Sequence, residues 1–204
     1  SAIDLMNCDF YQVYGLTETT GAITLLSPED HSIERGKLRS CGKPIPGVEI
    51  KIVDENKNEV PTGEVGEIIT KSDLNMKGYW NNDKATSEAF NNSWFYSGDL
   101  GYLDKDGFLF IHDRLKDMIV SGGENIYPAE VENALMSNSL ILDAAVVGIP
   151  DEKWGESTKA FVVLKNESDI SEEEIINYTK TKIASYKCPK SINFISELPR
   201  NPSG

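Results

Sequence analysis

The sequence predicts an α+β protein, with a β-rich first part and a smaller second part in which helices and strands alternate. Hydrophobic and polar residues alternate around Val48, Ile50 and Ile52, which is the period-2 pattern of a half-buried strand. Residues 101–111 have the pattern of a hairpin with its turn at Asp106-Gly107. After about residue 112, helix-start signals stand between short apolar runs.

The first part is expected to contain a strand over 48–52, a polar turn over 54–58 and a returning strand over 65–70. The hairpin at 101–111 follows them. The chain up to about residue 112 is therefore β-rich.

The second part begins with a predicted helix. Pro128 stands at its first turn, and a helical period places Val131, Ala134 and Leu135 on one face. Short apolar strands are expected at 144–149, 159–164 and 192–195.

A second helix is predicted after residue 170. Ser171 and Glu174 have the spacing of a capping box, which marks a helix start. We expect this acidic, amphipathic helix to continue to about Tyr186, because Pro189 then ends it.

Residues 113–117 mark a boundary between the two parts. Four of these five residues are charged, and they lie between apolar runs at 108–111 and 118–120. A charged connector at the surface explains this pattern. We therefore expect two domains, 1–113 and 114–204.

The composition excludes several classes of protein. Hydrophobic residues make up 39% of the 204 residues, and the formal net charge of −13 argues against a nucleic-acid partner. No apolar run approaches the roughly 20 residues of a transmembrane helix, and no signal-peptide pattern opens the chain, so we expect a cytoplasmic location. Cys8, Cys41 and Cys188 lie far apart, which favours free thiols over disulfides or zinc.

Three segments carry side chains suited to a nucleotide. In Tyr14-Gly-Leu-Thr-Glu18, the ring suits a base, the hydroxyl a phosphate and the carboxylate Mg²⁺. In 96–101, Asp99 follows a glycine and could accept hydrogen bonds from sugar hydroxyls. In 113–130, Gly122-Gly123 permits close backbone approach before a helix start. Taken singly, each segment is more simply explained as a turn or a helix-capping loop.

The order and spacing of these segments resemble the adenylate-forming superfamily of acyl-CoA synthetases, luciferases and peptide-synthetase adenylation domains. The resemblance extends to Gly66-Glu-Ile-Ile-Thr70, to Met76-Lys-Gly-Tyr-Trp80 and to 198–204, and so covers essentially the whole chain. It implies that 1–113 is the C-terminal, β-rich part of a large AMP-binding domain. Residues 114–204 would then be its small mobile C-terminal domain.

The resemblance implies an ATP-dependent, AMP-forming acid–thiol ligase that adenylates a carboxylic acid and transfers the acyl group to CoA. Five residues would contact the nucleotide or its metal ion. Tyr14 would stack on or flank adenine, Thr17 would contact the α-phosphate, and Glu18 would coordinate Mg²⁺. Asp99 and Arg114 would bind the ribose.

The remaining implied site residues lie in the second domain. Lys116 would be the hinge residue at which the domain rotates between the two half-reactions. Gly122, Gly123 and Glu124 would form the loop at which the thioester is made, where glycine leaves room for CoA. The family's phosphate loop is not found, and its catalytic lysine would directly follow Gly204. We therefore expect a fragment, truncated before that lysine and inactive by itself.

The loop at 121–132 is similar to the acyl-CoA ligase version of this motif. It favours a medium- or long-chain fatty acid as substrate and a role in fatty acid metabolism. An aryl acid such as a benzoate or coumarate is the second choice. A carrier-protein-directed adenylating enzyme and a non-catalytic nucleotide-binding relative also stay open.

Overall fold

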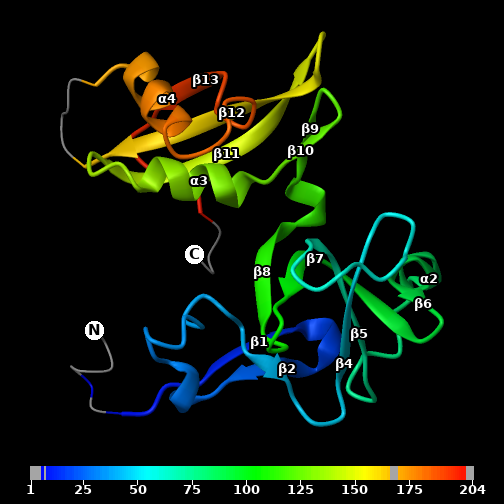
Figure 1. Cartoon of the computed structure of the whole chain (residues 1–204). Helices are drawn as coiled ribbons and strands as arrows, with labels where there is room; N and C mark the ends of the chain where they lie inside the picture. Colours follow the sequence, from blue (N-terminus) through cyan, green and yellow to red (C-terminus); the bar gives the residue numbers. More distant parts are fainter. Residues whose placement is uncertain (1–5, 7, 166–169, 201–204) are drawn as a thin grey trace. The chain divides into compact units, whose positions relative to one another are not determined.

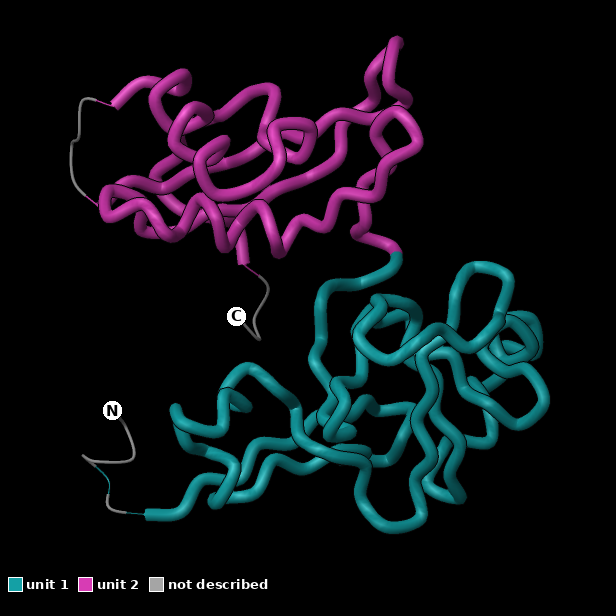
Figure 2. Tube along the Cα trace, in the orientation of Figure 1, with its two compact units in different colours: residues 1–115 teal, residues 116–204 magenta. Residues whose placement is uncertain are grey.

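The computed structural model describes residue 6, residues 8–165 and residues 170–200. The chain divides into two compact units, 1–115 and 116–204 (Figure 2), and each is described by itself. The sequence placed the boundary between residues 113 and 114, whereas the units divide within the short 3₁₀ helix η3 (Leu115–Asp117). Of the helices in the described ranges, none is long and apolar enough to cross a membrane.

Unit 1 opens with a small antiparallel sheet in the order β1 (Gln12–Leu16), β2 (Gly21–Leu26), β3 (Lys43–Pro44). The 3₁₀ turn η1 (Thr17–Thr19) joins the first two strands. A bulge between Tyr14 and Gly15 shifts the register of β1. A Cβ atom at Gly15 would lie 1.8 Å from the carbonyl oxygen of Gly21, so only glycine fits there.

A second antiparallel sheet of unit 1 has the order β4 (Glu49–Val53), β5 (Gly66–Lys71), β7 (Trp94–Leu103), β6 (Phe90–Asn91) (Figure 1). Strand β8 (Leu109–Arg114) pairs with β7 as the expected hairpin. Ile52, Ile68 and Leu109 form a buried cluster in this unit. The strands expected around residues 48–52 and 65–70 are confirmed as β4 and β5.

The hairpin turn between β7 and β8 is held by side chains. One carboxylate oxygen of Asp104 accepts hydrogen bonds from the backbone N–H groups of Asp106 and Phe108, each at 2.9 Å. Lys37 donates to both carboxylates of the turn and lies 4.7 Å from the centre of the Phe108 ring. Lys43 lies 4.6 Å from that centre. These contacts tie the loop after β2 to the hairpin.

Unit 2 is built on one sheet in the order β10 (Glu124–Ile126), β9 (Ile119–Ser121), β12 (Gly155–Leu164), β11 (Ile141–Asp151). Strand β13 (Ser191–Phe194) pairs with β12 in parallel. The strands expected at 144–149, 159–164 and 192–195 lie within or overlap β11, β12 and β13. Helices α3 (Pro128–Met136) and α4 (Glu172–Lys180) lie beside this sheet (Figure 1). Their apolar side chains join those of the strands in one buried cluster.

The start of each helix in unit 2 confirms the sequence signal, but the end of α4 does not. The capping box of Ser171 and Glu174 is present. The helix ends at Lys180 rather than near Tyr186. The hydroxyl of Thr181 donates to the carbonyl of Tyr178 at 2.7 Å, and such a local bond competes with the helical backbone pattern. The α+β class predicted for the chain is confirmed.

Candidate functional site

Asp99 is the centre of the candidate site in unit 1. It lies in β7, and only 7% of its surface is exposed. The Tyr14 hydroxyl donates to its Oδ2 at 2.6 Å, and Nε of Arg114 lies 3.5 Å from its Oδ1. Asp99 and Arg114 are cross-strand partners in the pairing of β7 with β8. The pairing register therefore places the guanidinium next to the buried carboxylate.

The irregular stretch of β7 before Asp99 is fixed by polar contacts. Gly98 has φ +71°, and its N–H donates to Oε1 of Glu67 at 3.0 Å. The Ser97 hydroxyl donates to the carbonyl of Ile68 at 2.6 Å and accepts from the Asp99 N–H at 3.1 Å. Strand β5 thus positions the carboxylate of Asp99 through both its backbone and a side chain.

The surroundings of Tyr14 keep its phenol protonated, so that its hydroxyl can donate a hydrogen bond. Burial, followed by the hydrogen bond to Asp99, holds the pKa of the Tyr14 phenol well above its ordinary value. Its ring packs against the buried cluster of unit 1. Burial also raises the pKa of the Glu67 carboxyl, although the Gly98 N–H acts in the opposite direction.

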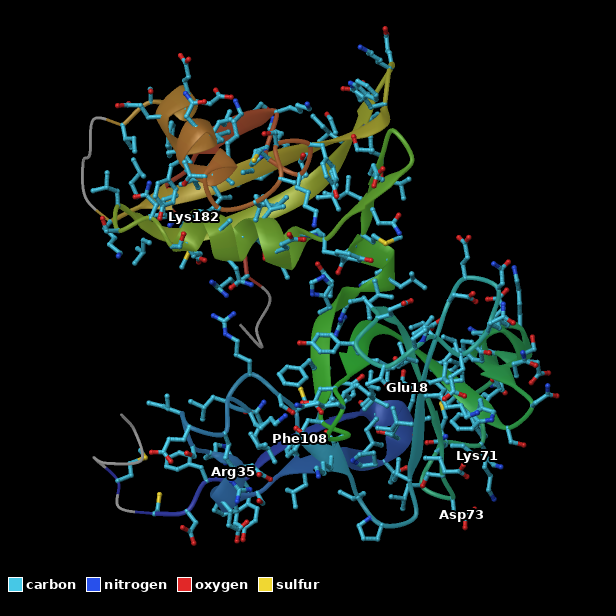
Figure 3. The ribbon with its side chains drawn as sticks, viewed as in Figure 1. Glu18, Arg35, Lys71, Asp73, Phe108 and Lys182 are labelled. Carbon is cyan, nitrogen blue, oxygen red and sulfur yellow. The ribbon has the colours of Figure 1, made fainter. Side chains whose placement is uncertain are left out.

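Glu18 lies in η1, directly after the strand that carries Tyr14, and is labelled in Figure 3. Its backbone carbonyl accepts from the N–H of Met76 at 2.6 Å. The hydroxyl of Tyr79 donates to its Oε1 at 3.0 Å. The neighbouring Thr17 is exposed at the start of η1. This turn therefore presents a hydroxyl and a partly exposed carboxylate.

The candidate residues of unit 2 lie at two places, in η3 and at the turn between β9 and β10. Lys116 is exposed and begins the unit. Gly122 and Gly123, with φ +61° and +87°, form the turn between β9 and β10, and Glu124 follows them exposed. A Cβ atom at Gly122 would lie 2.7 Å from the ring of Trp154, whereas one at Gly123 would meet nothing within 4 Å.

The last motif falls partly outside the described residues, because 201–204 are not described. Its Arg200 donates to Oδ2 of Asp143 at 2.6 Å. Residues 195 and 197–200 border, together with β11 and β12, a groove of about 690 Å³. The ion pair of Arg200 with Asp143 ties the segment after β13 to the sheet of unit 2.

The structure thus brings Tyr14, Asp99 and Arg114 into contact and places Glu18 on the turn that follows the strand of Tyr14. Sequence reasoning missed the residues that hold this site in place. Each of these residues makes a hydrogen bond to a site residue or to the residue next to one. They are Glu67, Ser97 and Tyr79. Glu67 and Tyr79 stand in segments that the family resemblance had singled out, but no local pattern gives them a role.

Glu18 and its neighbours would bind Mg²⁺ only together with ligands from the nucleotide and from water. Within the described ranges, no three His, Cys, Asp or Glu side chains are grouped so that they could hold a metal ion. Magnesium commonly takes one or two protein carboxylates and fills its octahedron with phosphate oxygens and water. A single oriented carboxylate at Glu18 suits that arrangement.

Two family models match the chain. The model of the AMP-binding enzyme matches residues 2–80, and the model of the AMP-binding enzyme C-terminal domain matches residues 130–204. The chain is 48% identical over 192 residues to a 2-succinylbenzoate–CoA ligase of Bacillus licheniformis, covering 94% of this chain and 39% of that protein. It is 43% identical over 198 residues to the long-chain-fatty-acid–CoA ligase FadD13 of Mycobacterium tuberculosis, covering 97% and 38%.

A solved structure also resembles the chain. It is o-succinylbenzoate CoA synthetase (MenE) from Bacillus subtilis with its acyl-adenylate intermediate. It matches with a TM-score of 0.86 and 42% identity, over 99% of this chain and 40% of that one. The same synthetase with ATP and a magnesium ion matches with a TM-score of 0.84 and 42% identity, over 98% and 41%.

The chain spans about two-fifths of the length of these relatives. The two family models belong to successive parts of one enzyme type, and they match the chain in that order on either side of the unit boundary. The chain belongs to the adenylate-forming (AMP-binding) enzyme superfamily.

Proposed function

We propose that the protein is an ATP-dependent acid–CoA ligase that forms an acyl-adenylate and passes its acyl group to CoA. The observation that carries this proposal is the buried carboxylate of Asp99 between Tyr14 and Arg114. A carboxylate offers about four acceptor positions, and the hydroxyl of Tyr14 uses one of them. The remaining positions suit the two adjacent hydroxyl groups of a ribose.

The nucleotide would contact unit 1 through the residues around Asp99. Arg114 would add guanidinium donors to the ribose, and Tyr14 would present the free part of its ring to adenine. The Thr17 hydroxyl would donate to the α-phosphate. This assignment follows the family resemblance, and the contact of Tyr14 and Arg114 with Asp99 supports it.

Glu18 would hold the Mg²⁺ that accompanies ATP. The bound ion would neutralise charge on the phosphates while pyrophosphate leaves. Glu18 suits this task because it is partly exposed and Tyr79 already orients one of its oxygens. The backbone carbonyl of Glu18 accepts from the N–H of Met76, and this bond fixes the turn.

Unit 2 would serve the thioester step. Lys116 would act as the hinge residue, since it is exposed and begins the unit. The turn at Gly122-Gly123 would leave room for the pantetheine arm of CoA, because Gly123 has open space where a side chain would stand. The exposed Glu124 would lie beside it.

The acid substrate is expected to be a fatty acid or an aryl acid. The loop at 121–132 favours a fatty acid, whereas the relatives include both a succinylbenzoate ligase and a fatty acid ligase, at 48% and 43% identity. A panel of both acid classes separates them. The complete gene product is given ATP, Mg²⁺, CoA and each acid, and acyl-CoA and AMP are measured by mass spectrometry.

We expect AMP and the matching acyl-CoA from one of the two classes. Release of ADP instead of AMP, or no thioester with any acid, would contradict the proposal. In the same assay, Asp99→Asn should raise the KM for ATP by about tenfold or more, because a hydrogen bond to a charged group is worth roughly 1.5–3 kcal/mol. Asp30→Asn, which alters an exposed pair with Arg35 in the same unit, is the matched control and should leave KM unchanged.

A further inference from the structure

Tyr79 has a contact that the proposed function does not use. Its hydroxyl donates to Oε1 of Glu18 at 3.0 Å, although the two residues lie 61 positions apart. The bond leaves the second carboxylate oxygen, Oε2, free for another ligand. It therefore orients the side chain that the proposed function assigns to Mg²⁺.

The segment that carries Tyr79 is fastened to the same turn at two further points. The N–H of Met76 donates to the carbonyl of Glu18 at 2.6 Å. The hydroxyl of Thr20 donates to the carbonyl of Leu74 at 2.6 Å. Residues 74–79 thus follow η1 closely, and the hydroxyl of Tyr79 is the contact that reaches the carboxylate itself.

Tyr79 is also held from its other side. Its backbone N–H donates to the hydroxyl of Thr86, in α2 (Asp83–Ala89), at 2.9 Å, and that hydroxyl donates to the carbonyl of Asn82 at 2.9 Å. Gly78 has φ +156°, and a Cβ atom there would lie 2.7 Å from Cγ2 of Thr86. The close approach of the loop to α2 therefore requires glycine, and it fixes the backbone from which the tyrosine ring extends.

We propose that Tyr79 is a positioning residue for Glu18 and that its hydroxyl strengthens the binding of Mg²⁺ with the nucleotide. This inference rests on the proposed role of Glu18. A carboxylate that already points in one direction loses less conformational freedom when it binds a metal. Residues that hydrogen-bond a metal ligand commonly contribute a factor of about 10–100 in metal affinity.

The test measures how far Mg²⁺ tightens nucleotide binding. Calorimetry on the complete gene product gives the affinity for a non-hydrolysable ATP analogue in Mg²⁺ and again in EDTA. Tyr79→Phe removes only the hydroxyl and should reduce the tightening by about tenfold, while affinity in EDTA stays unchanged. Glu18→Gln should reduce it as well. Tyr178→Phe is the matched control, because it removes a tyrosine hydroxyl bonded to the carbonyl of Ser137 in unit 2.

The outcomes separate this inference from the function on which it rests. If Glu18→Gln reduces the tightening and Tyr79→Phe does not, Glu18 keeps its role and the inference about Tyr79 is overturned. If Glu18→Gln changes nothing, the metal role of Glu18 and the inference fail together. Hydrogen exchange at the Met76 amide checks the fold, because its bond to Glu18 should persist in Tyr79→Phe. If Mg²⁺ tightens nucleotide binding less in Tyr79→Phe and the Met76 amide also exchanges fast, the variant has lost the loop. That result counts against the inference.

Discussion

Tyr14→Phe isolates the hydrogen bond at the centre of the candidate site. The substitution keeps the ring that packs against the cluster of unit 1, and it removes the hydroxyl that donates to Asp99 at 2.6 Å. A hydrogen bond to a charged group contributes roughly 1.5–3 kcal/mol, and a buried acceptor left without its donor is costly. Nε of Arg114 stays 3.5 Å from the other oxygen and offsets part of the loss.

We expect unit 1 to lose about 2 kcal/mol of its free energy of unfolding. With a urea dependence of about 2 kcal/mol per molar, the midpoint should fall by about 1 M. Unfolding is followed through the NMR signals of β7, so that unit 1 is observed by itself. Tyr102→Phe is the control, because Tyr102 also lies in β7, with its ring stacked on Phe110. Equal midpoints for the two variants would refute a stabilising role for the bond to Asp99.

Two further predictions concern stability. Burial raises the pKa of Glu67 above 4.5, so its folding contribution is complete below the unfolded pKa and is lost as pH rises through the folded value. Glu67→Gln should therefore gain stability relative to wild type as the pH rises above 4.5, and a difference independent of pH in urea titrations would contradict this cause. Gly122→Ala should destabilise unit 2 by about 1–3 kcal/mol, since φ is positive and the new methyl group meets Trp154. Gly123→Ala should lose only about 1 kcal/mol, and thermal melts that rank the two in the opposite order would exclude the clash.

The sequence could predict elements whose pattern is local. The alternation around Ile50 and Ile52 gives β4, and Ser171 with Glu174 gives the start of α4. Helix α2 was missed because it is seven residues long and buries none of them, so no apolar period marks it. Its start is marked by the Asn82 side chain, which accepts from the N–H of Ala85, and by Asp83 in the first turn.

The candidate site could likewise be predicted only in part from the sequence. Its residue types could be selected from motifs, but their contacts depend on packing across the unit. Tyr14 and Asp99 are 85 positions apart and meet because two different sheets bring them together. The bond between Glu67 and Gly98 likewise joins β5 to β7. The residues next to each of them in the sequence give no sign of this contact.

The boundary between the units has a mechanical consequence for Arg114. That residue is held by its pairing with Asp99 at the end of β8, and unit 2 begins at Lys116. Only Leu115 separates the last anchored position from the first residue of the next unit. Under the role proposed for Lys116, a change of its backbone torsions would turn unit 2 while the pairing of Asp99 with Arg114 stays intact. The residue proposed to bind the ribose and the residue proposed to be the hinge would thus be separated by a single leucine.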